Sequence, residues 1–171
     1  SVGAKSTLWS RLRAHKGTKN GGGNHRSSIF RLHVGAALLG RDRESLPTWG
    51  RGAATPVEVR RDLTAKAAEV ALEKRVSDYL GGMTVLWVDV PDEPGTDSDR
   101  AYIERNSIAL LSNGLAPLDA INGNWLGCSS PREEIRSSRL WNLKHVLESV
   151  DRHFLERFEV AIERTVRESR D

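Results

Sequence analysis

The chain has 171 residues, a net charge of +3 and a hydrophobic fraction of 38%. This length suffices for one domain with a buried core, and no apolar run approaches the length of a membrane span, so we expect a soluble protein without a membrane partner. Cys128 is the only cysteine. It excludes an internal disulfide and a cysteine-based zinc site, and it suits the reducing cytoplasm, where we expect the protein.

The charges are distributed unevenly along the chain. Residues 1–61 hold 12 Lys and Arg against three acids, whereas residues 62–171 hold 14 against 20. The first 33 residues carry seven basic side chains, three histidines and no acid. Such a segment repels itself unless it faces an anion, and a phosphate backbone is the commonest candidate. A solvated basic face is the alternative.

Capping residues and the spacing of apolar residues predict a largely helical chain. The predicted helices cover residues 7–16, 28–39, 55–80 and 99–112, a short stretch that begins at 130, and 152–168. The first helix begins at Ser6 or Thr7, and the glycine-rich tract 17–24 after it predicts a mobile basic loop. Residues 83–90, MTVLWVDV, are β-branched and aromatic and predict one strand.

The opening stretch VGAKSTLWSRLRAH places a glycine, a lysine, a serine and a threonine much as a phosphate-binding loop does. That loop needs two glycines at a fixed spacing after a buried strand, so that backbone N–H groups can surround the phosphates. Here Ala4 separates Gly3 from Lys5, and the sequence itself contains no strand before them. We therefore look for another explanation of this stretch.

Glu104 is an unusual residue on the predicted helix 99–112. Ala101, Ile108 and Leu111 lie at i−3, i+4 and i+7, so we expect the Glu104 side chain along the apolar stripe rather than in solvent. A carboxylate in that position needs a partner, because its desolvation alone is costly. Two interpretations stay open: an ion pair with an arginine at the edge of the stripe, or a ligand to a metal ion.

Arg11 and His15 lie four residues apart, on one face of the first helix and inside the acid-free segment. The arginine fork suits the oxygens of a phosphate, and an imidazole nearby can accept a proton close to neutral pH. Each residue taken alone is more typical of an ordinary surface side chain.

Together, the stretches TLWSRLRAH, GNHRSSIFRLHVGAALL and AYIERNSIALLSN resemble the GIY-YIG nuclease superfamily over about residues 3–126. The first helix of that family carries Leu-x-x-Arg-x-x-x-His/Tyr, which Leu8, Arg11 and His15 match. The opening stretch then resembles the lead into this helix, with Lys5 as a phosphate contact at most.

A later helix of the family carries a metal-binding glutamate in a pattern like Glu-x-Asn-x-Ile, which Glu104, Asn106 and Ile108 match. The two strands that name the family, each with a tyrosine, are expected just upstream of Ser1. The two tyrosines of this chain match neither, so we expect the chain to be incomplete at its N-terminus.

The resemblance implies an endonuclease that hydrolyses DNA phosphodiester bonds with Mg²⁺ or another divalent cation. Glu104 would hold the metal, Arg11 would stabilise charge on the scissile phosphate, and His15 would help to deprotonate the attacking water. An asparagine of the family's site corresponds to Asn113 or Asn122. The expected DNA contacts are Lys5, Arg13, Lys16, Lys19, His25 and Arg26.

The same resemblance implies an α+β fold, in which a small antiparallel sheet is flanked by helices, helix-rich in this chain. We expect a nuclease domain over residues 1–126 and a helical C-terminal extension over 127–171. One alternative is a non-catalytic nucleic-acid-binding module with a degenerate or truncated nuclease site. Others are an interaction protein whose helices from 56 and 152 bind a partner, and an HNH-type metal site at Asn24, His25 and His33.

Overall fold

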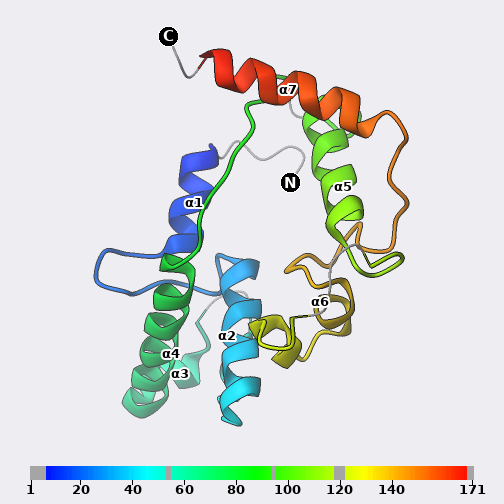
Figure 1. Ribbon diagram of the computed structural model, residues 1–171. Coiled ribbons are helices and arrows are strands. Elements are labelled where there is room, and N and C mark those ends of the chain that lie inside the picture. Colours follow the sequence, from blue (N-terminus) through cyan, green and yellow to red (C-terminus); the bar gives the residue numbers. More distant parts are fainter. Residues whose placement is uncertain (1–6, 53–54, 94, 118–121, 169–171) are drawn as a thin grey trace. The chain divides into compact units, whose positions relative to one another are not determined.

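The computed structural model describes residues 7–52, 55–93, 95–117 and 122–168. Over these ranges the chain forms seven α-helices and one 3-10 helix, and no strand (Figure 1). They are α1 (Leu8–Lys16), α2 (Ile29–Asp42), α3 (Val57–Arg61), α4 (Leu63–Gly81), α5 (Asp99–Leu111), η1 (Leu126–Ser129), α6 (Glu133–Ser138) and α7 (Phe154–Glu168). The chain divides into two compact units, and the expected domain boundary at residue 126 stays a prediction.

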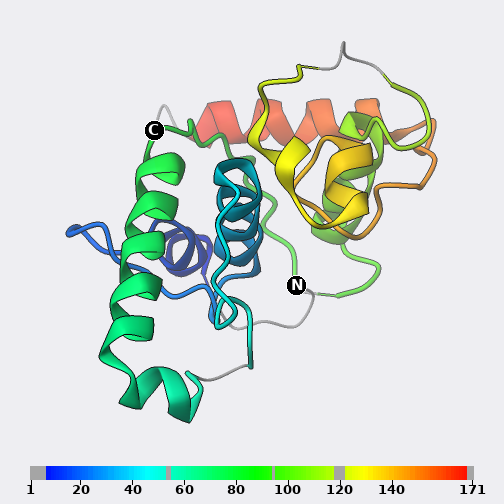
Figure 2. The ribbon, with the colours of Figure 1, turned by 90° about the horizontal axis from the view of Figure 1, so that it is seen from below.

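The N-terminal unit includes the described residues of 6–83 and 122–136 and contains α1 to α4 and η1. Helix α2 packs on α4 and on η1, and both α1 and α3 pack on α4. In Figure 2, α1 is seen end-on between α4 and α2. The apolar core consists of side chains from these helices: Val34, Ala37, Leu38, Val59, Leu72, Val76, Leu80 and Leu126.

The C-terminal unit includes the described residues of 84–121 and 137–171, with α5 packed on α7. Phe154 is buried at the start of α7, where its ring stacks on Phe158 with centroids 5.3 Å apart. The buried Asn106 of α5 donates from its amide to the Tyr102 carbonyl at 3.0 Å and accepts the Asp151 N–H at 2.8 Å. These contacts fix α5 against the segment that leads into α7.

The predicted helices near residues 7–16, 28–39, 99–112 and 152–168 are confirmed as α1, α2, α5 and α7. The caps explain three of the starts, because the side chains of Thr7, Ser28 and Ser98 each accept a backbone N–H from the first turn.

The prediction of one helix over 55–80 is wrong, since α3 ends at Arg61 and α4 begins at Leu63. Asp62 has an extended backbone there, and its carboxylate accepts the N–H groups of Thr64 and Ala65 at 2.8 and 3.2 Å. Aspartate is among the preferred N-cap residues, and this one starts a new helix rather than continuing the old one.

The expected α+β fold with a small antiparallel sheet is wrong for the described residues, which are all-helical. Residues 83–90, the expected strand, have no regular secondary structure, and Val85, Leu86 and Trp87 are 50%, 91% and 53% exposed. Branched and aromatic side chains suit a half-buried sheet surface, but a strand also needs a neighbouring strand for its backbone hydrogen bonds. No described segment forms such a ladder with residues 83–90.

Candidate functional site

Helix α1 of the N-terminal unit presents an exposed basic surface. It begins at the Thr7 cap and ends at Gly17, whose φ of +86° suits glycine and whose N–H donates to the Arg13 carbonyl at 2.9 Å. The predicted DNA-contact residues on and after this helix are exposed to solvent: Arg13, Lys16 and Lys19. Arg11 is exposed as well. The described chain carries no acidic residue before Asp42, so no carboxylate of the same segment neutralises these cations.

His15 is half-buried at the base of α1. Its Nδ1 lies 2.7 Å from the Ser28 hydroxyl oxygen, and its ring meets Phe30 edge-on with centroids 5.7 Å apart. Burial lowers the pKa of His15 below its ordinary value of 6.5, and the nearby positive charges of Arg11 and Arg31 lower it further. The imidazole is therefore neutral at physiological pH, so that one ring nitrogen carries a proton and the other can accept a hydrogen bond.

Arg31 of α2 is completely buried and connects α1 to α4. Its Nε and Nη2 donate to Glu73 Oε2 at 2.8 and 2.6 Å, and Nη2 also donates to the Glu73 carbonyl and the Ser77 hydroxyl. Its Nη1 donates to the carbonyl of His15 at 2.9 Å. Because a guanidinium carries five N–H donors in a fixed fork, these contacts hold the C-terminal end of α1 in place.

The other oxygen of Glu73 binds His25. Glu73 Oε1 accepts the His25 backbone N–H at 2.6 Å and lies 2.9 Å from His25 Nδ1, while His25 Nε2 accepts the Gly50 N–H at 3.3 Å. The Trp49 ring stacks on the imidazole with centroids 3.8 Å apart. Burial opposes ionisation of Glu73, but the hydrogen bonds from His25 and Arg31 outweigh it and lower the pKa of this carboxylate.

Arg26 makes a second pair on the same side of α4. Its Nη1 and Nη2 donate to the two oxygens of Glu69 at 2.8 and 2.7 Å, and Nη2 reaches the Thr48 carbonyl at 3.3 Å. The structure thus engages both His25 and Arg26, two expected DNA contacts, with carboxylates of α4. Their contact with DNA stays a prediction.

The two carboxylates that organise this cluster, Glu69 and Glu73, were missed by sequence reasoning. A signal was present, because they lie at i and i+4 on α4 among apolar residues. The glycine tract gives a second signal. A Cβ on Gly23 would lie 2.1 Å from Arg31 Cζ, so this glycine lets the loop cross the buried guanidinium.

The remaining site predictions fall in different places. Lys5 lies outside the described residues. Asn122, in the N-terminal unit, is exposed, and its side-chain oxygen accepts the Asn124 N–H at 3.0 Å. Asn113, in the C-terminal unit, is half-buried, and its backbone N–H donates to the Ser138 carbonyl at 2.9 Å. Neither arrangement tests which asparagine belongs to an active site.

Glu104 is exposed on α5, which corrects the expectation that it points along an apolar stripe. The buried positions of the helix are Asn106 and Ala109, while Leu111 is 58% exposed, so the buried face follows a different set of residues. Because Glu104 belongs to the C-terminal unit and Arg11 to the other, their convergence on one site stays a prediction.

Metal-ligating side chains do not cluster in the part of the chain that the structure describes, where no group of three or more His, Cys, Asp or Glu is placed to hold an ion. His33 of the HNH-type alternative is buried on α2, and burial and Arg132 lower its pKa. A single exposed carboxylate such as Glu104 fits a mode of Mg²⁺ binding that needs no cluster of protein ligands. In that mode Mg²⁺ keeps several waters and binds one or two carboxylates together with substrate phosphates.

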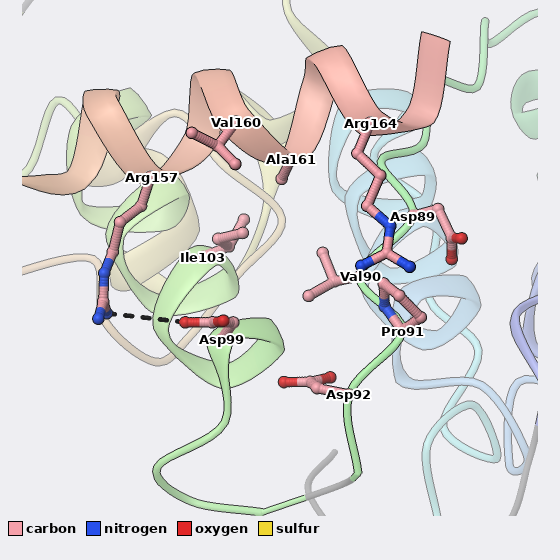
Figure 3. A pocket seen from close by; sticks show the side chains of 10 residues that line it. All are labelled: Asp89, Val90, Pro91, Asp92, Asp99, Ile103, Arg157, Val160, Ala161 and Arg164. Atoms are coloured by element: carbon pink, nitrogen blue, oxygen red, sulfur yellow. Dashed lines mark ion pairs between the residues drawn. The ribbon is translucent and has the colours of Figure 1, made fainter. Parts of the chain in front are cut away.

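A pocket of about 280 Å³ lies in the C-terminal unit between α5, α7 and the extended chain before α5 (Figure 3). Its charged residues have both signs, and Arg157 pairs with Asp99 at 3.7 Å. The lining comprises Asp89, Val90, Pro91, Asp92, Asp99, Ile103, Arg157, Val160, Ala161 and Arg164. None of the predicted site residues is among them.

Comparison with known proteins identifies the chain at the level of a family. Searches of curated proteins and of solved structures gave no match. Among the described residues, no helix is both long and apolar enough to span a membrane. The family model described as GIY-YIG domain matches residues 1–168, which is nearly the whole sequence. The chain therefore belongs to the GIY-YIG domain family, a family of nucleases.

Proposed function

We propose that this protein hydrolyses DNA phosphodiester bonds with the help of Mg²⁺ or another divalent cation. The observation that carries the proposal is the arrangement on α1, where the exposed Arg11 precedes a neutral His15 by one helical turn. Family membership supports the reaction class, and Arg11 and His15 fit the first-helix pattern of the family that the sequence resembles.

Each residue has a role that its chemistry suits. The Arg11 guanidinium lies in solvent on α1, where it can donate two parallel hydrogen bonds to a phosphate and stabilise the charge that develops on it. His15 reaches the same phosphate from one turn further along the helix. The cations Arg13, Lys16 and Lys19 bind the DNA backbone and position it without reading its sequence.

Glu104 is the residue that would hold the metal ion. Its exposed carboxylate is a hard oxygen ligand, the type that Mg²⁺ prefers. A bound divalent ion supplies charge stabilisation at the phosphate and at the leaving oxygen. This role requires Glu104 and Arg11 to face one DNA strand in the functional protein.

Cleavage of plasmid DNA by the full-length protein tests the proposal. We expect nicking with MgCl₂, none with EDTA, and a loss of roughly 10²–10³ in rate for Arg11→Ala, the range measured when a charge-stabilising donor is removed. Arg43→Ala is the matched control, because Arg43 is also exposed in the N-terminal unit but lies beyond α1. Salt-sensitive DNA binding without metal-dependent cleavage would instead indicate a non-catalytic nucleic-acid-binding module.

A further inference from the structure

Ser28 joins the helix cap of α2 to the imidazole of His15. The residue is 2% exposed, and its hydroxyl oxygen accepts the Arg31 N–H at 3.2 Å as the N-cap of α2. The same oxygen lies 2.7 Å from His15 Nδ1, an ordinary hydrogen-bond distance. The hydrogen bonds of this hydroxyl therefore influence which ring nitrogen of His15 is protonated.

A serine hydroxyl has one hydrogen to donate and two lone pairs that accept. The Arg31 N–H uses one lone pair, and among the described residues the other hydrogen-bond partner of the hydroxyl is His15 Nδ1. If the ring carried its proton on Nδ1, the Ser28 hydrogen would be buried without an acceptor, which native structures avoid. All groups are satisfied when Ser28 donates to Nδ1, and the proton of the neutral ring is then on Nε2.

We propose that Ser28 holds His15 as the Nε2–H tautomer, so that His15 donates a hydrogen bond to a phosphate oxygen of the DNA rather than taking a proton from the attacking water. The hydrogen bond from His15 to DNA rests on the proposed function, whereas the tautomer of His15 is inferred from the contacts of Ser28 alone. Ser28 is then a positioning residue that acts through His15.

The surrounding contacts restrict the ring in the same way. Arg31 holds the His15 carbonyl at 2.9 Å, so the backbone that carries the ring is fixed, and the Phe30 ring packs against the imidazole in a T-shaped arrangement. Burial and the positive charges of Arg11 and Arg31 favour the neutral ring, in which the choice of tautomer matters. Because Nδ1 is hydrogen-bonded to Ser28, Nε2 is the ring nitrogen that can bind a ligand.

Nitrogen NMR of the histidine rings tests the tautomer without any nuclease activity. The two ring nitrogens give well-separated signals according to which one is protonated, and the His15 signals are assigned by their loss in His15→Gln. Above the pKa of His15, we expect protonated Nε2 and unprotonated Nδ1 in the wild-type protein. Protonated Nδ1 would overturn the proposal.

Variants of Ser28 test the cause of the preference. Ser28→Ala removes the hydroxyl, so the His15 signals should move toward the average of the two tautomers. Ser28→Thr keeps a hydroxyl and a helix cap, so the His15 signals should stay as in the wild type. Ser27→Ala is the matched control, because its exposed hydroxyl bonds the Asn24 carbonyl instead. Unchanged His15 signals in folded Ser28→Ala would refute the role of Ser28. Should that variant not fold, a wild-type-like spectrum of Ser28→Thr supports the proposal, and inverted nitrogen signals there refute it.

Cleavage by two His15 variants separates donation from proton abstraction. The amide nitrogen of Gln can replace the Nε2–H donor but cannot act as a base, so we expect His15→Gln to retain activity within about 10-fold and His15→Ala to lose roughly 10²–10³. Equal, severe losses in both would restore the general-base role and overturn the donor role. Full activity in both would remove His15 from the proposed function and overturn its contact with DNA, while leaving the NMR result on Ser28 intact.

Discussion

Replacing Glu73 by glutamine should destabilise the N-terminal unit strongly. Both carboxylate oxygens of Glu73 receive only donors: Arg31 at 2.6 and 2.8 Å on Oε2, and the His25 N–H at 2.6 Å on Oε1. The amide NH₂ of the new side chain would face one of these donors, and the buried Arg31 charge would lose its partner. Breaking a buried pair in this way costs about 3–5 kcal/mol of unfolding free energy.

Urea denaturation followed by circular dichroism measures this cost. With a slope of about 2 kcal/mol/M, the loss moves the midpoint down by about 1.5–2.5 M. Glu168→Gln is the control, since its i,i+4 pair with Arg164 lies in solvent, where screening leaves such a pair little effect on stability. A loss below about 1 kcal/mol in Glu73→Gln, far under the cost of breaking a buried pair, would refute the assignment of this cluster as the link between α1, α2 and α4.

The buried pair of Glu73 and Arg31 predicts that the stability of the protein depends on pH. The pKa of Glu73 is lowered in the folded protein, so its contribution to stability is present above the ordinary value of 4.5 and is lost as the pH falls through the folded value. Between pH 6 and acid pH, the unfolding free energy of the wild-type protein should therefore fall more steeply than that of Glu73→Gln. Parallel curves for the two proteins would contradict this reasoning.

Two further outcomes follow from the loop and the basic surface. Replacing Arg13, Lys16 and Lys19 by alanine should weaken the salt dependence of DNA binding, which fluorescence anisotropy measures. The slope of log K against log salt should become shallower by about 0.9 for each phosphate that is no longer neutralised. An unchanged slope would indicate that these residues form a solvated face. Gly23→Ala should lower the melting temperature, because the new Cβ would lie 2.1 Å from Arg31 Cζ, whereas at Gly81 an alanine meets nothing within 4 Å and should be neutral or stabilising.

The positions of α1, α2, α5 and α7 were predictable from the sequence because their signals are local. Thr7, Ser28 and Ser98 cap α1, α2 and α5 through their own side chains, as short-range patterns predict. The expected strand over residues 83–90 failed for the opposite reason, since a strand depends on a partner that composition does not specify.

The candidate site was predictable only in part. The spacing of Arg11 and His15 on one helix follows from sequence, but the pairing of residues in the buried charge cluster does not, because His25 and Glu73 meet across 48 positions of the chain. The exposure of Glu104 also depends on tertiary packing, since α5 buries Asn106 rather than a purely apolar stripe. A buried polar side chain of this kind changes which face of the helix is buried, so the spacing of the apolar residues does not predict that face.

Metal-dependent cleavage by Glu104→Gln is the decisive test of a nuclease site in which Glu104 holds the metal ion. The substitution keeps the size of the side chain and one oxygen but removes the charge that would hold Mg²⁺. Glu163→Gln, on an exposed position of α7, is the matched control. We expect Glu104→Gln to match the wild type in melting temperature and in metal-free DNA binding but to lose plasmid cleavage by orders of magnitude, while Glu163→Gln cuts normally. Normal cleavage by Glu104→Gln would rule out a metal-binding role for this carboxylate.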